Sequence, residues 1–463
     1  MTGKRRIAII GAGASGTVAA IDLMRKGLAS ELILIDSNPL LHRGLAYSTK
    51  FASHLLNVPA LKMSIIKEEP DDFLIWLKES GFAAHPKTFA PRMHFGNYLQ
   101  ETFERIAENS ATGVRILADN AASIEITKTG FKVSLTGGQT EEVDKIIVAS
   151  GWQIPSRPHS SPKVFDLTYK LPETLQDGKS ATIIGTGLTA IDTVLSIRNI
   201  GFEGQITMIS RRGVIPQTHM LEDMPEQNFS TDMTLRQLFR FFKVRAKERK
   251  TQGLSWHGLL DGFRPKTQEY WKNLSLAEKS RFLRHARPYW DVHRHRMAEE
   301  ISTAIHSELG SGKLQIIAAK ISNVIERESH VEIKMRQRGK LHEIIHKADI
   351  LIKASGADVL PAAALPPLFQ SMILQDLAVP DVFSLGLNCT FNGELLDSKG
   401  QIVPGIFAIG PVARANLWES VAMPEIVSMA GKISDIIQNQ PDPEATHSKL
   451  YSRVNQFDAI DLN

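Results

Sequence analysis

Hydrophobic residues occur along the chain in short apolar runs that alternate with helical patterns, which is typical of a parallel α/β fold. Residues 7–10 form an apolar run that predicts a buried strand, and residues 17–26 have helical character. A second apolar run covers residues 32–35. The order of strand, turn, helix and strand predicts a βαβ unit at the start of the sequence.

The turn between the first predicted strand and helix is rich in glycine. Gly11 allows a tight turn, Gly13 lets backbone N–H groups approach a pyrophosphate on the helix N-terminus, and Gly16 permits close helix–strand packing. Asp36 ends the second strand, twenty residues after Gly16, where it could accept hydrogen bonds from a ribose diol. An ordinary βαβ turn is the alternative. The strand, the glycine turn, the helix, the second strand and its terminal acid all occur in the expected order and spacing, which favours a dinucleotide site. The expected contact residues are Gly11, Gly13, Ala14, Ser15, Gly16, Asp36 and Ser37.

The same pattern returns in the middle of the chain. Residues 181–199 predict a strand, a GxGxxA turn and a helix, and the next predicted strand, 205–209, runs into Arg211 and Arg212 where the first unit has Asp36. A carboxylate would repel a 2'-phosphate, whereas arginine offers it a bidentate, charge-assisted fork. The alternative is that both arginines are ordinary surface residues that contact only solvent. We predict NADPH rather than NADH here, with contacts from Gly185, Gly187, Leu188, Thr189, Arg211 and Arg212.

The order of these units predicts the domain organisation. Two predicted strands close on Ala-Ser-Gly, at Gly151 and Gly356, and we expect the chain to cross between two nucleotide-binding domains at these turns, which would also contact cofactor. Arg211 and Arg212 assign the nicotinamide nucleotide to the second unit, which leaves FAD for the first. The predicted fold class is α/β, with two Rossmann-like dinucleotide-binding domains, for FAD and NADPH, and a helical insertion. The predicted segments are 1–154 and 356–463 for the FAD domain, 155–213 and 311–355 for the NADPH domain, and 214–310 for the insertion.

Two further patterns belong to the predicted FAD domain. Residues 114–135 contain three short apolar runs that predict a small antiparallel meander. Residues 404–409 have the pattern of the closing strand of a flavoprotein. The turn at Gly410 and Pro411 would meet the ribityl chain, and the following helix would point its positive end at the flavin pyrimidine.

Composition and charge exclude several classes. The 463 residues are 43% hydrophobic and 22% charged with a formal net charge of +4, which suits a soluble globular protein and suggests no nucleic-acid partner. No apolar run approaches the roughly 18 residues of a membrane span, and the first strand begins too early for a signal peptide, so we expect a cytoplasmic protein with no membrane partner. The single cysteine, Cys389, rules out an internal disulfide and a redox-active cysteine pair.

One segment is strongly basic. Residues 281–296 contain five arginines and three histidines against one acid, Asp291. The segment could hold an anionic substrate or cover nucleotide phosphates, but helical charge runs are more often solvated faces. His293 and His295 are two residues apart, not the three or four that place metal ligands on one helix face, so we predict no metal site.

Five short motifs resemble a known family. They are Arg43-Gly-Leu-Ala-Tyr-Ser48, His54-Leu-Leu-Asn-Val-Pro-Ala60, Met63-Ser64, Trp290-Asp-Val-His-Arg-His295 and Leu417-Trp-Glu419. Together they resemble a largely uncharacterised bacterial family of FAD/NAD(P)-binding proteins, which includes FAD-dependent urate hydroxylases and lies near the amine N-hydroxylating and Baeyer–Villiger flavin monooxygenases. The resemblance spans nearly the whole chain but selects no substrate. One departure is Gly410-Pro411 where many flavoproteins have Gly-Asp, so ribityl contacts must come from the backbone or other side chains.

The resemblance implies an FAD- and NADPH-dependent monooxygenase that hydroxylates a small polar, nitrogen-containing substrate with dioxygen, through a C4a-peroxyflavin kept dry by the protein. An NADPH-dependent reductase serving a quinone or protein acceptor, and a non-catalytic flavin sensor, are the alternatives. Substrate and oligomeric state stay open. FAD contacts are expected from Arg43, Tyr47, Ser48, Asn57, Met63 and Trp418, with Asn57, Met63 and Trp418 as catalytic candidates; core packing is the alternative for Met63 and Trp418.

Overall fold

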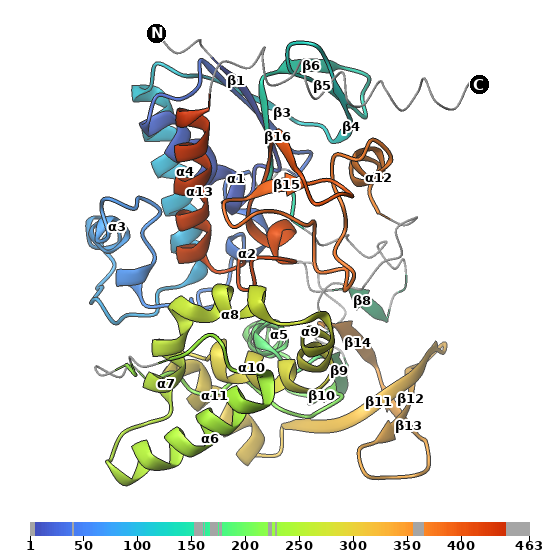
Figure 1. Ribbon diagram of the computed structural model, residues 1–463. Helices are drawn as coiled ribbons and strands as arrows, with labels where there is room; N and C mark the ends of the chain where they lie inside the picture. Colours follow the sequence, from blue (N-terminus) through green and yellow to red (C-terminus); the bar gives the residue numbers. More distant parts are fainter. Residues whose placement is uncertain are drawn as a thin grey trace, which may run out of the picture.

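The computed structural model describes residues 5–38, 41–151, 161, 163–166, 175, 178–220, 225–226, 229–354 and 365–440. The first and last parts of the chain form the upper half of the molecule in Figure 1, and the middle of the chain forms the lower half. Each half is built around its own sheet, in which most strands pair in parallel. The predicted α/β fold with two dinucleotide-binding domains is therefore confirmed.

The upper domain contains a six-stranded sheet in the order β15-β16-β7-β1-β2-β3. All neighbours are parallel except β15 and β16. Side chains on both faces of β1 are buried, which is why its sequence is a continuous apolar run. The strands are β1 (Arg6–Ile10), β2 (Glu31–Ile35), β3 (Gly113–Leu117), β7 (Lys145–Val148), β15 (Glu394–Leu396) and β16 (Ile402–Ala408).

Helices cover this sheet, and α1 packs between α4 and α13. The helical segments of the upper domain are α1 (Ala14–Arg25), α2 (Gly44–Tyr47), η1 (Ala60–Lys62), α3 (Asp72–Glu79), α4 (Arg92–Asn109), α12 (Pro367–Leu374), η6 (Gly410–Ala413) and α13 (Met423–Asn439). The carboxyl ends of β1, β7 and β16 meet at one edge of the sheet, so the turns that follow these strands converge there.

A three-stranded antiparallel sheet lies beside the parallel one and consists of β4 (Ala121–Ile126), β5 (Phe131–Leu135) and β6 (Thr140–Val143). The sequence prediction placed residues 114–117 in this meander, and that assignment is wrong. These residues form β3, which pairs in parallel with β2 instead. Local patterning indicates a strand but not its partner, because pairing is decided by distant parts of the chain.

The lower domain has a seven-stranded sheet in the order β13-β12-β11-β10-β9-β14-β8. Its strands are β8 (Val164–Asp166), β9 (Ser180–Ile184), β10 (Gln205–Ser210), β11 (Leu314–Glu326), β12 (Val331–Gln337), β13 (Ile344–Ala348) and β14 (Ile350–Lys353), with α5 (Leu188–Asn199) and α11 (Glu299–Gly310) against them. In this sheet β12 pairs in antiparallel fashion with both β11 and β13. Helix α11 lies within the predicted insertion, yet its Ile305 is fully buried in the core of this domain. It precedes β11, which pairs in parallel with β10, and so acts as the crossover helix of that βαβ unit.

The remaining helices of the insertion form a separate aromatic core that Trp418 and Leu385 of the upper domain complete. They are α6 (Leu235–Thr251), α7 (His257–Phe263), η3 (Arg264–Lys266), α8 (Thr267–Asn273), α9 (Leu276–Arg281), the π-helix η4 (Phe282–Ala286) and α10 (Arg287–Arg294). In Figure 1 most of these helices lie below the upper domain, in front of the second sheet. Within the described ranges, no helix combines the length and apolarity needed to cross a bilayer.

Candidate functional site

The three glycines of the first turn occupy crowded positions. Gly11 has φ +102°, and a Cβ atom there would lie 2.6 Å from the backbone of Ala149 and Ser150. A Cβ atom on Gly16 would lie 1.9 Å from the carbonyl oxygen of Gly11, so only glycine lets α1 approach β1 this closely. Gly13 is the N-cap of α1 and no side chain caps this end, which leaves N–H groups of the first turn available to an anion.

Asp36 braces this turn from the end of β2. Its carboxylate accepts hydrogen bonds from the backbone N–H groups of Ala12 and Asn38, both at 2.8 Å. A carboxylate has about four lone-pair positions, so two remain for a ribose diol. Ser37 donates its hydroxyl hydrogen to Asn120 at 2.9 Å.

The stretch that carries the first family motif lies over the glycine turn. The N–H group of His42 donates to the carbonyl oxygen of Ala12 at 2.7 Å, with His42 at φ +65°. A Cβ atom on Gly44 would lie 3.3 Å from Cα of Gly13. These contacts put residues 42–47 beside the N-terminus of α1, where the predicted phosphates would bind.

Three predicted cofactor residues in this stretch have partners within the protein. The guanidinium group of Arg43 donates twice to Oε1 of Gln100 on α4, at 3.2 and 2.8 Å. Tyr47 packs on Phe95 with ring centroids 4.7 Å apart, and burial raises the pKa of Tyr47 to about 12. Ser48 donates its hydroxyl to a main-chain carbonyl one turn earlier, at 2.6 Å. Direct contact of these three side chains with FAD stays a prediction.

The closing turn of the upper domain meets the first glycine turn. Gly410 has φ +77°, and a Cβ atom there would lie 2.3 Å from Oγ of Ser15. Ser420 donates its hydroxyl to the carbonyl oxygen of Gly410 at 2.9 Å, which fixes the loop that follows. Gly151, at φ +75°, follows β7 at the same edge of the sheet, and Pro411 is the second residue of the short helix η6. Gly356 lies outside the described residues.

The three catalytic candidates lie in different surroundings. Met63 is 2% exposed and belongs to the core of the upper domain. Trp418 is also 2% exposed, but it stacks on Trp271 at 4.5 Å in the core of the insertion. Asn57 is half-buried, and no described residue forms a hydrogen bond with its side chain. Packing in the core is enough to explain a buried methionine at position 63. The catalytic roles of all three residues stay predictions.

The second glycine turn lies at the edge of the lower sheet. Gly185 has φ +127° and donates its N–H to the carbonyl oxygen of Ile209 at 2.8 Å. Gly187 is the N-cap of α5, again without a side-chain cap, and Leu188 and Thr189 form the first turn of that helix. Space is open around Gly187, since a Cβ atom there would meet nothing within 4 Å.

Arg211 and Arg212 follow β10 directly, as Asp36 follows β2. Arg211 is exposed and Arg212 is half-buried. Neither forms an ion pair with any residue in the described part of the chain. Their charges are therefore available to an anionic group at the carboxyl end of β10.

Polar contacts tie the two domains together near the second turn. His54 of the upper domain bonds through Nε2 to the hydroxyl of Ser196 at 2.7 Å and to the carbonyl oxygen of Asp192 at 3.0 Å, both on α5. Arg92 donates to the carboxylate of Asp192 at 2.6 Å. Burial lowers the pKa of His54, so the imidazole is neutral at neutral pH.

A pocket of about 490 Å³ lies between the upper domain and the insertion. This volume is in the range of small-molecule sites. Lys62 from η1 borders it, close in sequence to Asn57, and the first turns of α13 border it from another side. The lining residues are Lys62, Arg264, Pro265, Thr267, Gln268, Trp418, Glu419, Pro424, Glu425, Ser428, Met429 and Lys432.

One wall of this pocket includes Glu419, which belongs to a buried ion pair. Glu419 is 4% exposed and accepts hydrogen bonds from Nε1 of Trp290 at 3.0 Å and Nε of Arg294 at 2.7 Å. Glu419 also has φ +72°, a left-handed conformation that is strained for a non-glycine residue and that concentrates at functional sites. The contacts to the insertion hold this conformation in place.

A second ion pair links the same elements. Arg264 of the insertion binds Glu425, in the first turn of α13, through two hydrogen bonds of 2.8 Å each. Neither of these two pairs was predicted, because their partners lie more than 100 residues apart and no local pattern marks them. The sequence signal for the first pair was the presence of Trp290 and Arg294 in one family motif and of Glu419 in another.

The C-terminal end of the basic segment 281–296 is structural, whereas Arg281, Arg284 and His285 are exposed. Arg294 and Arg296 are 8% and 3% exposed, and they pair with Glu419 and Asp261. Burial lowers the pKa of His295 to about 4, so this side chain adds no charge at neutral pH. The segment therefore anchors the insertion at its C-terminal end and presents charge to solvent at its N-terminal end.

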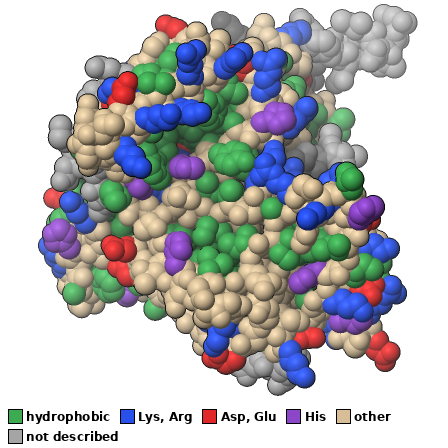
Figure 2. Space-filling view, turned by 90° about the horizontal axis from the view of Figure 1, so that it is seen from below, with side chains coloured by type: hydrophobic (Ala, Val, Ile, Leu, Met, Phe, Trp, Pro, Cys, Tyr) green, Lys and Arg blue, Asp and Glu red, His purple; other side chains and the backbone are tan. Residues whose placement is uncertain are grey.

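A different basic surface lies on α6. Five exposed cations recur there every three or four residues, which places them on one helix face, and none has an ion-pair partner within the described residues: Arg236, Arg240, Lys243, Lys247 and Lys250. Lys and Arg side chains gather in the upper part of the view in Figure 2.

Two glycine turns, each between a parallel strand and an uncapped helix, define the class: a protein with two dinucleotide-binding domains. A family model described as FAD-NAD(P)-binding matches residues 8–153 of the first domain. No curated protein sequence matches the chain.

Solved structures match over nearly the full length. The ornithine N-hydroxylase of Kutzneria sp. 744, in complex with reduced FAD, NADP⁺ and L-ornithine, is 14% identical over 94% of this chain and 99% of its own, with a TM-score of 0.64. The FAD-bound cadaverine monooxygenase of Erwinia amylovora is 14% identical over 95% of each chain, with a TM-score of 0.66. The bacillithiol disulfide reductase of Staphylococcus aureus is 13% identical over 95% and 100%, with a TM-score of 0.55. At these identities the likeness establishes the fold alone.

Proposed function

We propose that this protein is a monooxygenase that uses FAD and NADPH to hydroxylate a small, polar, nitrogen-containing substrate. One observation carries the choice of cofactors: Asp36 ends the second strand of the first βαβ unit, whereas Arg211 and Arg212 stand at the same point of the second unit. A carboxylate suits a free ribose diol and two arginines suit a ribose phosphate. FAD is thereby assigned to the upper domain and NADPH to the lower one.

The residues of the upper domain fit FAD. The N-terminus of α1 offers N–H groups to the pyrophosphate, and Asp36 retains acceptor capacity for the ribose. Gly410 approaches Ser15 closely enough to exclude any side chain between the closing turn and α1. When bound, FAD supplies the redox chemistry that links NADPH to dioxygen.

The pocket of about 490 Å³ is the proposed substrate site. Trp418, a member of the aromatic core of the insertion, and the buried Glu419 line it on one side, and we infer that they keep bulk water from entering there. Lys62 and Lys432 contribute positive charge at its rim. The chain's own contribution is thus to position a substrate and keep one wall of the site dry.

The lone cysteine argues against a disulfide reductase. Cys389 is the only cysteine in the sequence and is buried, and burial raises the pKa of its thiol to about 12. A disulfide reductase needs a reactive thiolate, usually with a second cysteine. For this reason we set disulfide reduction aside, and we propose the cytoplasm as the compartment of the reaction.

Anaerobic mixing with NADPH followed by exposure to dioxygen tests the proposed function. We expect flavin bleaching by NADPH, then reoxidation with release of a hydroxylated product from a panel of ornithine, lysine, cadaverine and urate. Reduction without any oxygenated product, together with rapid turnover on a quinone in the absence of dioxygen, would instead identify a reductase. Purified protein that binds FAD and never accepts hydride would identify a flavin-binding sensor.

The cofactor preference has its own test. Replacing Arg211 and Arg212 together by alanine should raise the KM for NADPH roughly 10- to 150-fold, because a hydrogen bond to a charged group contributes about 1.5–3 kcal/mol. The KM for NADH should change little, since NADH lacks the 2'-phosphate. Arg240→Ala on α6 is the matched control and should leave both values unchanged. Equal losses for the two nucleotides would contradict the assignment.

A further inference from the structure

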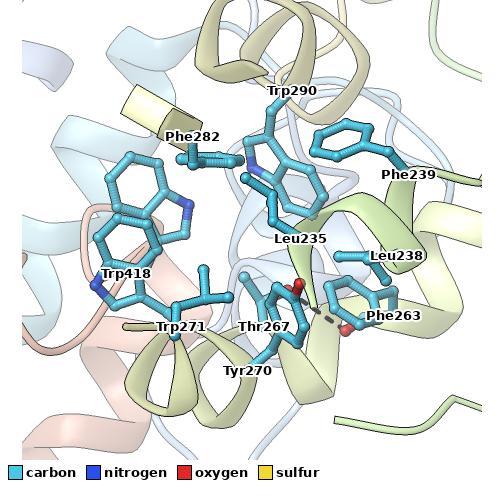
Figure 3. Close-up of a pocket in the computed structure, with 11 residues that line it drawn as sticks. Leu235, Leu238, Phe239, Phe263, Thr267, Tyr270, Trp271, Phe282, Trp290 and Trp418 are labelled. Atoms are coloured by element: carbon cyan, nitrogen blue, oxygen red, sulfur yellow. Dashed lines mark hydrogen bonds between the residues drawn. The ribbon is translucent and has the colours of Figure 1, made fainter. Parts of the chain in front are cut away.

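A small second cavity lies inside the insertion, next to the proposed substrate pocket. Its volume is about 20 Å³, enough for one molecule the size of water or a diatomic gas and too small for an amine or a nicotinamide. Figure 3 shows aromatic rings closing around it from several helices. The lining residues are Leu235, Leu238, Phe239, Phe263, Thr267, Tyr270, Trp271, Leu274, Phe282, Trp290 and Trp418.

The walls of this cavity favour an apolar guest. Leucine and aromatic side chains form all of the lining apart from Thr267. The hydroxyl of Thr267 and the indole N–H groups of Trp271 and Trp290 donate to other oxygen atoms of the protein. Tyr270 and Trp418 alone keep a polar atom without a partner among the described lining residues. A buried water typically makes about three hydrogen bonds, so this lining offers it poorer bonding than bulk solvent does.

The position of the cavity connects it to the reaction site. Trp418 and Thr267 line both the cavity and the pocket of about 490 Å³, so one indole ring and one threonine separate the two spaces. Phe282, whose ring centroid lies 5.4 Å from that of Trp418, begins the five-residue π-helix Phe282–Ala286. Such π-helical segments are rare and frequently mark functional sites.

We propose that this cavity is a binding site for dioxygen, from which the gas reaches the substrate pocket past Trp418. The proposal rests on the function proposed above, because only an oxygen-using enzyme needs such a site. Dioxygen is small, apolar and uncharged, so it partitions into dry aromatic cavities as xenon does. No amine substrate or nucleotide shares this chemistry.

Tryptophan fluorescence provides a direct readout, since three of the six tryptophans line the cavity. Dissolved dioxygen quenches indole emission on contact. In Leu238→Phe, where the added ring fills the void, the quenching constant should fall by up to about half, with a matching loss of xenon binding by ¹²⁹Xe NMR. Leu238→Ala enlarges the void and should raise xenon occupancy. Leu276→Phe, at a site 61% exposed on the neighbouring helix α9, is the control and should behave as wild type.

Stopped-flow kinetics on the holoenzyme complete the test. We expect Leu238→Phe to slow reoxidation of the reduced enzyme several-fold while anaerobic reduction by NADPH keeps its rate. Unchanged quenching and xenon binding in both Leu238 variants would overturn the proposal, as would normal reoxidation in a Leu238→Phe protein that no longer binds xenon. Xenon binding that responds to both variants in a protein with no oxygen-dependent turnover would refute the proposed function and leave a gas-binding cavity.

Discussion

Gly16→Ala tests the first glycine turn most directly. Gly16 lies inside α1, so helix propensity alone would make alanine more stable by about 1 kcal/mol. The added Cβ atom, however, would lie 1.9 Å from the carbonyl oxygen of Gly11 and 3.1 Å from the side chain of Ile9. The closer atom belongs to the backbone of the turn and cannot rotate away, so α1 must move off β1 by about 1 Å or more. Overpacking of this kind costs about 1–3 kcal/mol, and here the upper end applies.

The measurement is thermal unfolding together with the flavin content of the purified protein. A domain of this size loses about 2–4 °C in Tm per kcal/mol, so Gly16→Ala should unfold several degrees lower and retain less FAD. Gly310→Ala is the matched control: Gly310 is also helical, and a Cβ atom there would meet nothing within 4 Å. Full FAD content and an unchanged Tm in Gly16→Ala would refute the claim that close packing at this turn shapes the pyrophosphate site.

Three other predictions concern buried polar groups. Glu419→Ala leaves the buried charge of Arg294 without a partner, and denaturant titration should show a loss of about 3–5 kcal/mol in unfolding free energy. A Glu419→Leu/Arg294→Met double variant should recover much of this loss, because it removes both buried charges. Equal losses in the two variants would contradict a buried-charge penalty. Burial lowers the pKa of His219 to about 3 and of His295 to about 4. Below about pH 6.5 the unfolded chain therefore binds more protons than the folded protein, and Tm should fall as the pH drops from 6.5 towards 4. The fall should be less steep in a His219→Asn/His295→Asn variant. An equally steep fall in the variant and the wild type would contradict this explanation. His54→Ala removes the contact to α5 and should speed proteolysis between the domains with little change in bound FAD, while loss of FAD would mean that His54 acts on the first site instead.

Sequence periodicity was sufficient for the two βαβ units because each is a local structure. The apolar run before Gly11, the turn glycines and the acid at Asp36 are close in sequence, and steric limits on φ and helix packing select glycine at those positions. The second unit at Gly185 obeys the same local rules. The fold class and the positions of the two turns could therefore be predicted from local patterns.

Local patterns could not predict which distant segments pair with each other. The run at residues 113–117 looks like any exposed strand, and only the free edge of β2 makes it part of the parallel sheet. Met63 and Trp418 both appear as large apolar residues in motif segments, but tertiary packing puts Met63 in the first core and Trp418 in the insertion. A hydrophobic side chain carries no local sign of which core it will join.

The sequence by itself determined the two nucleotide turns and the contrast between an acid and two arginines at their ends, because short-range geometry and charge decide both. The tertiary structure alone decided how the insertion closes on the first domain. Glu419 pairs with Arg294 across 125 residues, and Glu419 can line the pocket as a buried carboxylate only because the fold buries its partner beside it. Burial and distance between remote residues are properties of the folded chain, and no local pattern encodes them.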